Sequence, residues 1–171
     1  VDVTSKTSSP EIAAKYYRPI SQGANLVSIP LDPDDTSLAS VLQTISYDIV
    51  WAYNTTDISD PWKSYVEAKP YKGDLWEINN TIGFWVNCTS SGGLVTVGIA
   101  PGCTTIYLKA GWNLISYPSF TPRTVGEVFS AVAYESVVDF DGRILKDSDY
   151  MMPGSAYWVK MAVSAVLTIC N

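Results

Sequence analysis

Three cysteines and seventeen aspartates and glutamates are the residues of this chain best able to do chemistry, because the sequence contains no histidine. Without an imidazole there is no Ser-His-Asp or Cys-His nucleophile system, no His-based zinc site and no general base of the commonest kind. Cys88, Cys103 and Cys170 are too few for a four-thiolate metal site. No glycine-rich loop has the spacing that cradles a phosphate. We therefore expect a protein that is not an enzyme.

Carboxylates gather at two places in the chain, before a predicted helix and again in the second half. They are Asp32, Asp34, Asp35, Asp139, Asp141, Asp147 and Asp149. Calcium takes oxygen ligands from such acidic loops, so a calcium site is one hypothesis. Asp34 and Asp35 also suit the start of a helix, and Asp141-Gly142 suits a tight turn. We expect no cofactor, with calcium as the alternative.

The odd number of cysteines leaves one thiol after any single bridge. Cys103 opens one predicted strand and Cys170 ends another, so they could form a disulfide if these strands are antiparallel neighbours. A Cys88–Cys103 bridge, which closes a shorter loop, is the alternative. If Cys103 pairs with Cys170, Cys88 is the candidate for a covalent link between subunits. A disulfide would suit an extracellular protein.

Three tripeptides match the acceptor pattern for N-glycosylation, and each has threonine at its third position. Their asparagines are Asn54, Asn79 and Asn87. Together they favour an exported glycoprotein, although asparagine and threonine are also common in this chain.

Aromatic residues are abundant, with six tryptophans and eleven tyrosines. Four tryptophans lie in or beside predicted strands and are expected in the core: Trp51, Trp85, Trp112 and Trp158. Four other rings lie in a long loop that the second half of the chain lacks: Trp62, Tyr65, Tyr71 and Trp76. These four could contact a sugar or a neighbouring subunit, or could fold back over their own sheet.

The strands and helices that must position these residues belong to two similar halves of the chain, which indicate an internal duplication. Gly23-Ala24-Asn25-Leu26-Val27-Ser28-Ile29-Pro30 returns about ninety residues later as Gly111-Trp112-Asn113-Leu114-Ile115-Ser116-Tyr117-Pro118. Further on, Phe84-Trp85-Val86 returns as Tyr157-Trp158-Val159. We divide the chain into an N-terminal arm at 1–19, a first β repeat at 20–102 and a second at 103–171. The two repeats could form one compact body.

The fold class expected is mainly β, as a sandwich- or barrel-like arrangement with one short helix in each repeat. Apolar spacing places the helices near residues 38–45 and 125–132. Glycine-containing loops predict hairpins that pair 84–88 with 94–97 and 105–108 with 112–117, and a third hairpin is expected between 157–161 and 165–169. The arm is interpreted either as a frayed terminus or as a strand donated to a neighbour's sheet edge.

Several pieces of the chain occur together in an order that resembles a known family. They include Tyr-Asp-Ile-Val-Trp-Ala-Tyr at 47–53, Gly-Phe-Trp-Val at 83–86 and Gly-Trp-Asn-Leu-Ile-Ser-Tyr-Pro at 111–118. The set resembles a β-rich module found, often in tandem, in archaeal and some bacterial cell-surface, sheath and S-layer-type proteins. The resemblance covers residues 20–170, and the first copy departs from it at Ala24, where the pattern has tryptophan. The resemblance implies a cell-surface location and a tandem β-rich architecture, and it implies no catalysed reaction.

Charge and hydropathy argue against two further classes, nucleic-acid-binding proteins and membrane-spanning proteins. A net charge of −6 argues against a nucleic-acid partner, and no apolar stretch approaches the length of a membrane span. We expect an extracellular structural protein that assembles with copies of itself into a surface layer, sheath or filament. The alternative is a secreted module that binds carbohydrate through the aromatic loop.

Overall fold

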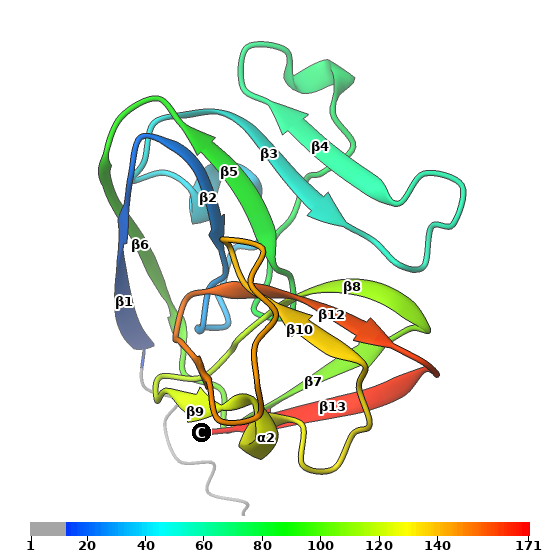
Figure 1. Ribbon diagram of the computed structural model, residues 1–171. Coiled ribbons are helices and arrows are strands. Elements are labelled where there is room, and N and C mark those ends of the chain that lie inside the picture. The colour runs from blue at the N-terminus through cyan, green and yellow to red at the C-terminus, as the bar shows by residue number, and fades with distance from the viewer. Residues whose placement is uncertain (1–12) are drawn as a thin grey trace, which may run out of the picture.

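A computed structural model of the chain describes residues 13–171, and antiparallel β-strands form most of it (Figure 1). The first repeat contains β1 (Ala13–Ile20), β2 (Gly23–Val27), α1 (Leu38–Val41), β3 (Tyr47–Tyr53), β4 (Trp62–Val66), η1 (Pro70–Lys72), β5 (Phe84–Cys88) and β6 (Gly92–Ile99). The second repeat contains β7 (Cys103–Leu108), β8 (Gly111–Ser116), β9 (Arg123–Thr124), α2 (Val125–Val128), β10 (Ser136–Val138), β11 (Tyr150–Met151), β12 (Ala156–Met161) and β13 (Ala165–Cys170).

The strands pair in the same way in both repeats. One sheet has the order β2-β5-β3-β4 in the first repeat and β8-β12-β10 in the second. A separate two-stranded sheet joins β1 to β6, and its counterpart joins β7 to β13. The mainly β fold with one short α-helix in each repeat is therefore confirmed. None of the sheets of the described residues closes into a barrel.

Strand β1 belongs to the body of the first repeat. It pairs along its whole length with β6, from Ala13 opposite Ile99 to Ile20 opposite Gly92. Residues 13–19 were expected in an N-terminal arm, as a frayed terminus or a strand donated to a neighbour, but they pair within their own chain, so the boundary at residue 19 is corrected. Residues 1–12 lie outside the described residues. The misplacement arose because β1 and β7 share no obvious sequence motif, although they hold the same place in the fold.

The three predicted hairpins are also wrong. Strand β5 pairs with β2 and β3, and β6 pairs with β1. Likewise β8 and β12 pair with each other, while β7 pairs with β13. Each of these three short loops turns the chain from one sheet into another, so that the strands on its two sides lie in different sheets (Figure 1).

The corner between the first two strands of each repeat depends on a glycine and an asparagine. Gly23 and Gly111 have φ values of 93° and 92°, a region that favours glycine. The Asn113 side chain accepts a hydrogen bond from the Lys109 N–H at 2.9 Å and donates to the Lys109 carbonyl at 2.8 Å. Asn25 makes the matching pair of bonds with Ser21. The repeated Gly-x-Asn motif is therefore structural.

Each repeat has its own hydrophobic core, and a third, smaller cluster joins the repeats. Leu26, Leu114 and Ala156 are buried at this junction, and aromatic rings from both repeats pack against them. Val27 pairs with Ser155 and Ile115 pairs with Ile82 as isolated β-bridges across the junction.

The two bridges are equivalent under the duplication, since Val27 and Ile115 hold the same position in the repeat, as do Ile82 and Ser155. The hydrogen bonds repeat the pattern: the Ser28 N–H donates to the Gly154 carbonyl at 2.9 Å, and the Ser116 N–H donates to the Thr81 carbonyl at 3.3 Å. An approximate twofold relation therefore joins the repeats, as in an isologous dimer.

Candidate functional site

A groove of about 400 Å³ opens on the surface where the two repeats meet. It is lined by Tyr53, Trp62, Trp112, Val138 and Trp158, and we call it the aromatic groove. Trp62 is 47% exposed and Trp112 is 42% exposed. Exposed large rings gathered in one place are unusual on a monomer and mark a contact surface.

The rings of the aromatic groove touch one another edge to face. The Trp158 ring centre lies 5.2 Å from that of Tyr53, 5.6 Å from that of Trp62 and 6.3 Å from that of Trp112. Tyr53 and Trp62 are themselves 5.2 Å apart. Such T-shaped contacts stabilise the set and hold the rings in fixed positions.

Strand pairing positions the rings. Tyr53 and Trp62 are cross-strand partners at the ends of β3 and β4. In the second repeat, Val138 of β10 is the partner of Trp158 on β12. Trp112 stands on β8, which pairs with the other edge of β12. The groove therefore rests on strands of both repeats.

The aromatic groove has no counterpart on the other side of the approximate twofold. The Tyr53–Trp158 contact is repeated there by Phe140 and Trp85, whose ring centres are 5.6 Å apart. At the position of Trp112, however, the first repeat has Ala24. Strand β4, which carries Trp62, has no equivalent in the second repeat. The groove is thus one-sided.

A larger pocket of about 600 Å³ adjoins the aromatic groove and shares Tyr53 with it. Polar groups that line this pocket include Asn54, Thr56, Lys63 and Asp74. The Lys63 ammonium lies 2.8 Å from the Asp57 carboxylate and 3.1 Å from that of Asp74.

The charges of this pocket stabilise one another. Hydrogen bonds from Lys63 and Ser59 lower the pKa of Asp57 to about 2. Hydrogen bonds to Asp57 and Asp74 raise the pKa of Lys63. All three groups are therefore ionised at neutral pH, and the lysine is fully paired.

The four rings assigned to a long loop have different surroundings. The segment is not a loop, because Trp62–Val66 forms strand β4 and Pro70–Lys72 forms a 3-10 turn. Trp62 lies in the aromatic groove. Tyr65 is partly buried against Tyr47, and Trp76, 54% exposed, packs on Tyr65 at 6.2 Å. Tyr71 is exposed.

Sequence reasoning missed three of the four rings of the aromatic groove. Trp112 was expected in the core, which is wrong, because the residue is 42% exposed and lines the groove. Trp158 is partly buried, and Tyr53 was not singled out. The signal that could have found the site was the mismatch between Trp112 and Ala24 in otherwise matching motifs.

The three asparagines of the glycosylation pattern differ in accessibility. Asn54 is exposed, and its side-chain oxygen accepts from both the Thr56 N–H and hydroxyl. Asn79 makes the same pair of bonds with Thr81 but is partly buried. Asn87 lies inside β5 and donates to the Asp48 carboxylate at 2.9 Å. Asn54 is the most accessible of the three.

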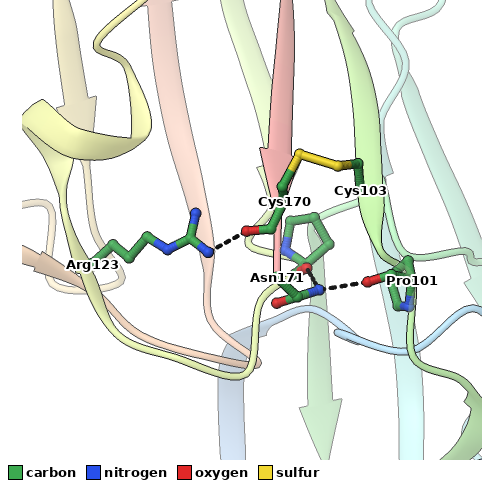
Figure 2. The surroundings of a disulfide bond; sticks show 6 residues. Pro101, Cys103, Arg123, Cys170 and Asn171 are labelled. Atoms are coloured by element: carbon green, nitrogen blue, oxygen red, sulfur yellow. Dashed lines mark hydrogen bonds between the residues drawn. A yellow bond between two sulfur atoms is a disulfide. The ribbon is translucent and has the colours of Figure 1, made fainter.

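The disulfide between Cys103 and Cys170 is confirmed, and it joins the paired ends of β7 and β13 (Figure 2). Asn171 then donates to the Pro101 carbonyl at 2.8 Å, which ties down the chain end (Figure 2). Cys88 is a free thiol that is only 2% exposed, and burial raises its pKa. The hypothesis of an intersubunit bridge through Cys88 is therefore wrong for this folded state.

The described residues contain no group of three or more carboxylates, cysteines or histidines that could hold a metal ion. Four of the seven aspartates considered for calcium, Asp35, Asp139, Asp147 and Asp149, have other side-chain partners. Asp35 accepts from the Ser37 N–H at the start of α1, and Asp139 pairs with Arg143 at 3.2 Å. Asp147 accepts from the Tyr134 hydroxyl. The geometry gives calcium no support.

The outer edge of β13 is open, unlike the matching edge of β6. In the first repeat the Thr44 hydroxyl accepts from the Val95 N–H at 2.9 Å and donates to the Gly93 carbonyl at 3.0 Å. Ala131 stands at the position of Thr44 in the second repeat. The matching groups of β13 are the Val166 carbonyl and the Thr168 N–H. Within residues 13–171, neither of them has a hydrogen-bond partner.

A groove of about 180 Å³ runs along this open edge, lined by β13 and by the segment that follows α2. Ala131, Val166 and Thr168 all line it. The groove ends near Arg123, whose guanidinium donates to the Cys170 carbonyl (Figure 2).

No family model, curated protein or solved structure matches this chain. Among the described residues, no helix has the length and apolar character needed to cross a bilayer.

Proposed function

We propose that this chain is an extracellular structural protein whose copies assemble into a surface layer, sheath or filament. The observation that carries the proposal is the open edge of β13 at Val166 and Thr168. An extended segment of a neighbouring copy would add to this edge as a further strand, because free N–H and C=O groups are a template for pairing.

Comparison of the two repeats shows that the edge of β13 is uncovered where the equivalent edge of β6 is covered. Two strands with the same place in the fold differ in what lies beside their outer edge, since the Thr44 hydroxyl bonds to the edge of β6 and Ala131, at the equivalent position, has no hydroxyl to bond to β13. Proteins that remain monomers usually protect such edges. Exposed apolar side chains on the same two-stranded sheet, Val166 and its cross-strand partner Tyr107, would add contact area.

Other features support an extracellular location. The Cys103–Cys170 disulfide suits an oxidising compartment, and an acidic chain with an accessible glycosylation pattern at Asn54 suits export. The resemblance to tandem modules of archaeal surface proteins points to the same location.

The substitution Ala131→Thr tests the proposal directly. The new hydroxyl is expected to cover Val166 and Thr168 as Thr44 covers Gly93 and Val95, and so to weaken assembly at least about tenfold. Sedimentation velocity over a range of concentrations, with electron microscopy of the same samples, measures the change.

The matched control is Ala131→Val, which has the shape of threonine without the hydroxyl. We expect it to assemble like the unchanged chain. Equal assembly of the threonine and valine variants would contradict the proposed edge, and an unchanged chain that stays monomeric throughout would contradict self-assembly itself.

A further inference from the structure

We infer that the aromatic groove is a binding site for a neutral oligosaccharide or polysaccharide chain. This site is separate from the β13 edge and does not depend on self-assembly. Four rings, those of Tyr53, Trp62, Trp112 and Trp158, line one groove and come from both repeats.

The chemistry of the groove fits a sugar. One face of a pyranose ring presents C–H bonds with slight positive charge, and the face of an indole or phenol ring is slightly negative. Sugars therefore stack on such rings. The rings contact each other in T-shaped pairs, at 5.2 to 6.3 Å between centres, and Trp62 and Trp112 keep 47% and 42% of their surface exposed to a ligand.

The neighbouring pocket supplies the polar groups that a sugar also needs. It begins at Tyr53, which belongs to both cavities, and it offers the side chains of Asn54, Thr56, Lys63 and Asp74. A few fixed polar groups beside an apolar wall are the usual composition of a small-ligand site. Sugar hydroxyls can donate to carboxylate oxygens and accept from amide groups.

The electrostatics favour a neutral sugar over an acidic one. The one cation lining this pocket, Lys63, is already paired with Asp57 and Asp74. The chain as a whole carries a net charge of −6, which would repel uronic acids or sulfated sugars. A neutral chain of linked pyranoses needs no free cation and is not repelled by the negative charge.

The asymmetry of the duplication argues against a purely structural role for these rings. The second repeat has Trp112 where the first has Ala24, and both strands fold in the same way. Trp112 is therefore not needed to form its strand. Trp62 stands on β4, the strand that only the first repeat possesses. The two most exposed rings of the groove are thus the two that the duplicated fold does not need.

The test uses the full chain and a panel of soluble probes: hexamers of β-1,4-linked glucose, β-1,4-linked N-acetylglucosamine and α-1,6-linked mannose, together with an oligogalacturonate. Isothermal titration calorimetry and tryptophan fluorescence measure binding. We expect at least one neutral hexamer to bind and the acidic probe to bind at least tenfold more weakly.

The variants Trp112→Ala and Trp62→Ala are each expected to weaken that binding by about tenfold or more, which corresponds to about 1.4 kcal/mol. Trp112→Ala installs the residue that the first repeat already has at this position, so the strand will accept it. The matched control is Trp76→Ala, which removes an equally exposed tryptophan outside the groove.

Three results would overturn the inference. The first is that none of the neutral probes binds at millimolar concentration. The second is binding that survives both groove substitutions while thermal unfolding shows the variants folded. The third is that the groove variants lose self-association but bind sugar normally, which would assign the rings to contact between copies of the chain.

Discussion

At the scale of single residues, Asn25 and Asn113 are the structural residues of the repeated motif. The side chain of each holds the turn between the first two strands of its repeat through hydrogen bonds to the backbone. Asn113 is nearly fully buried and donates to the carbonyls of Lys109 and Gly111. It also accepts from the Lys109 N–H. Asn25 makes equivalent bonds, but it is only partly buried, so water can replace some of its partners.

We therefore predict unequal costs for the same substitution in the two repeats. Asn113→Ala should lower the free energy of unfolding by about 2 to 3 kcal/mol, because buried groups lose their partners. Asn25→Ala should lower it by about 1 kcal/mol. Urea unfolding followed by circular dichroism measures both. Equal losses would show that burial does not set the energy of this corner.

At the scale of elements, the disulfide fastens the outermost pair of strands of the second repeat. Cys103 and Cys170 are 67 residues apart in sequence and directly opposite in the β7–β13 register. The first repeat has the equivalent β1–β6 pair without a bridge and gains longer strands instead, with eight residues in each.

We predict that replacing both cysteines, as Cys103→Ser with Cys170→Ser, lowers the free energy of unfolding by about 4 kcal/mol. The expected size follows from the entropy of the loop that the bridge closes in the unfolded chain. Urea unfolding of both chains measures the difference.

The control is the unchanged chain in excess reductant, whose stability should fall to that of the double variant. A double variant as stable as the oxidised chain would show that strand pairing alone holds this end of the molecule.

The positions of the strands could be predicted from the sequence better than their pairing. The duplicated apolar segments located most strands correctly, because the same residues form the same strands in both repeats. The pairing of strands could not be predicted, since the loops at Gly23 and Gly111 have the composition of hairpin turns but lead into another sheet. The aromatic groove was partly predicted through Trp62. Its other members, Trp112 and Trp158, come together only through strand pairing across the junction of the repeats.

At the scale of the whole molecule, the junction has the form of a dimer interface enclosed in one chain. The main-chain hydrogen bonds of Ser28 and Ser116 are equivalent, as are the two isolated bridges. Leu26 and Leu114, which hold the same position in the repeat, lie in the same junction cluster.

This symmetry predicts that a fragment of residues 101–171 forms a homodimer, because a second copy of the fragment can take the place of the first repeat. Leu114 would meet its own equivalent, and the Ser116 N–H would donate to the partner's Gly154 carbonyl as that of Ser28 does in the intact chain. Sedimentation equilibrium measures the mass. A fragment that folds as a monomer at high concentration would contradict the prediction.

The single threonine-to-alanine difference between Thr44 and Ala131 has a consequence for the form of any assembly. A body with two open edges related by a twofold axis would offer two identical acceptors and could branch or grow alike in both directions. The acceptor at Val166 and Thr168 occurs once in each copy, because Thr44 covers its counterpart, so each copy can receive only one neighbour at this site. Contacts of this heterologous kind lead to rings or to polar, unbranched fibres whose two ends differ. Growth by addition at one end would follow from one missing hydroxyl group.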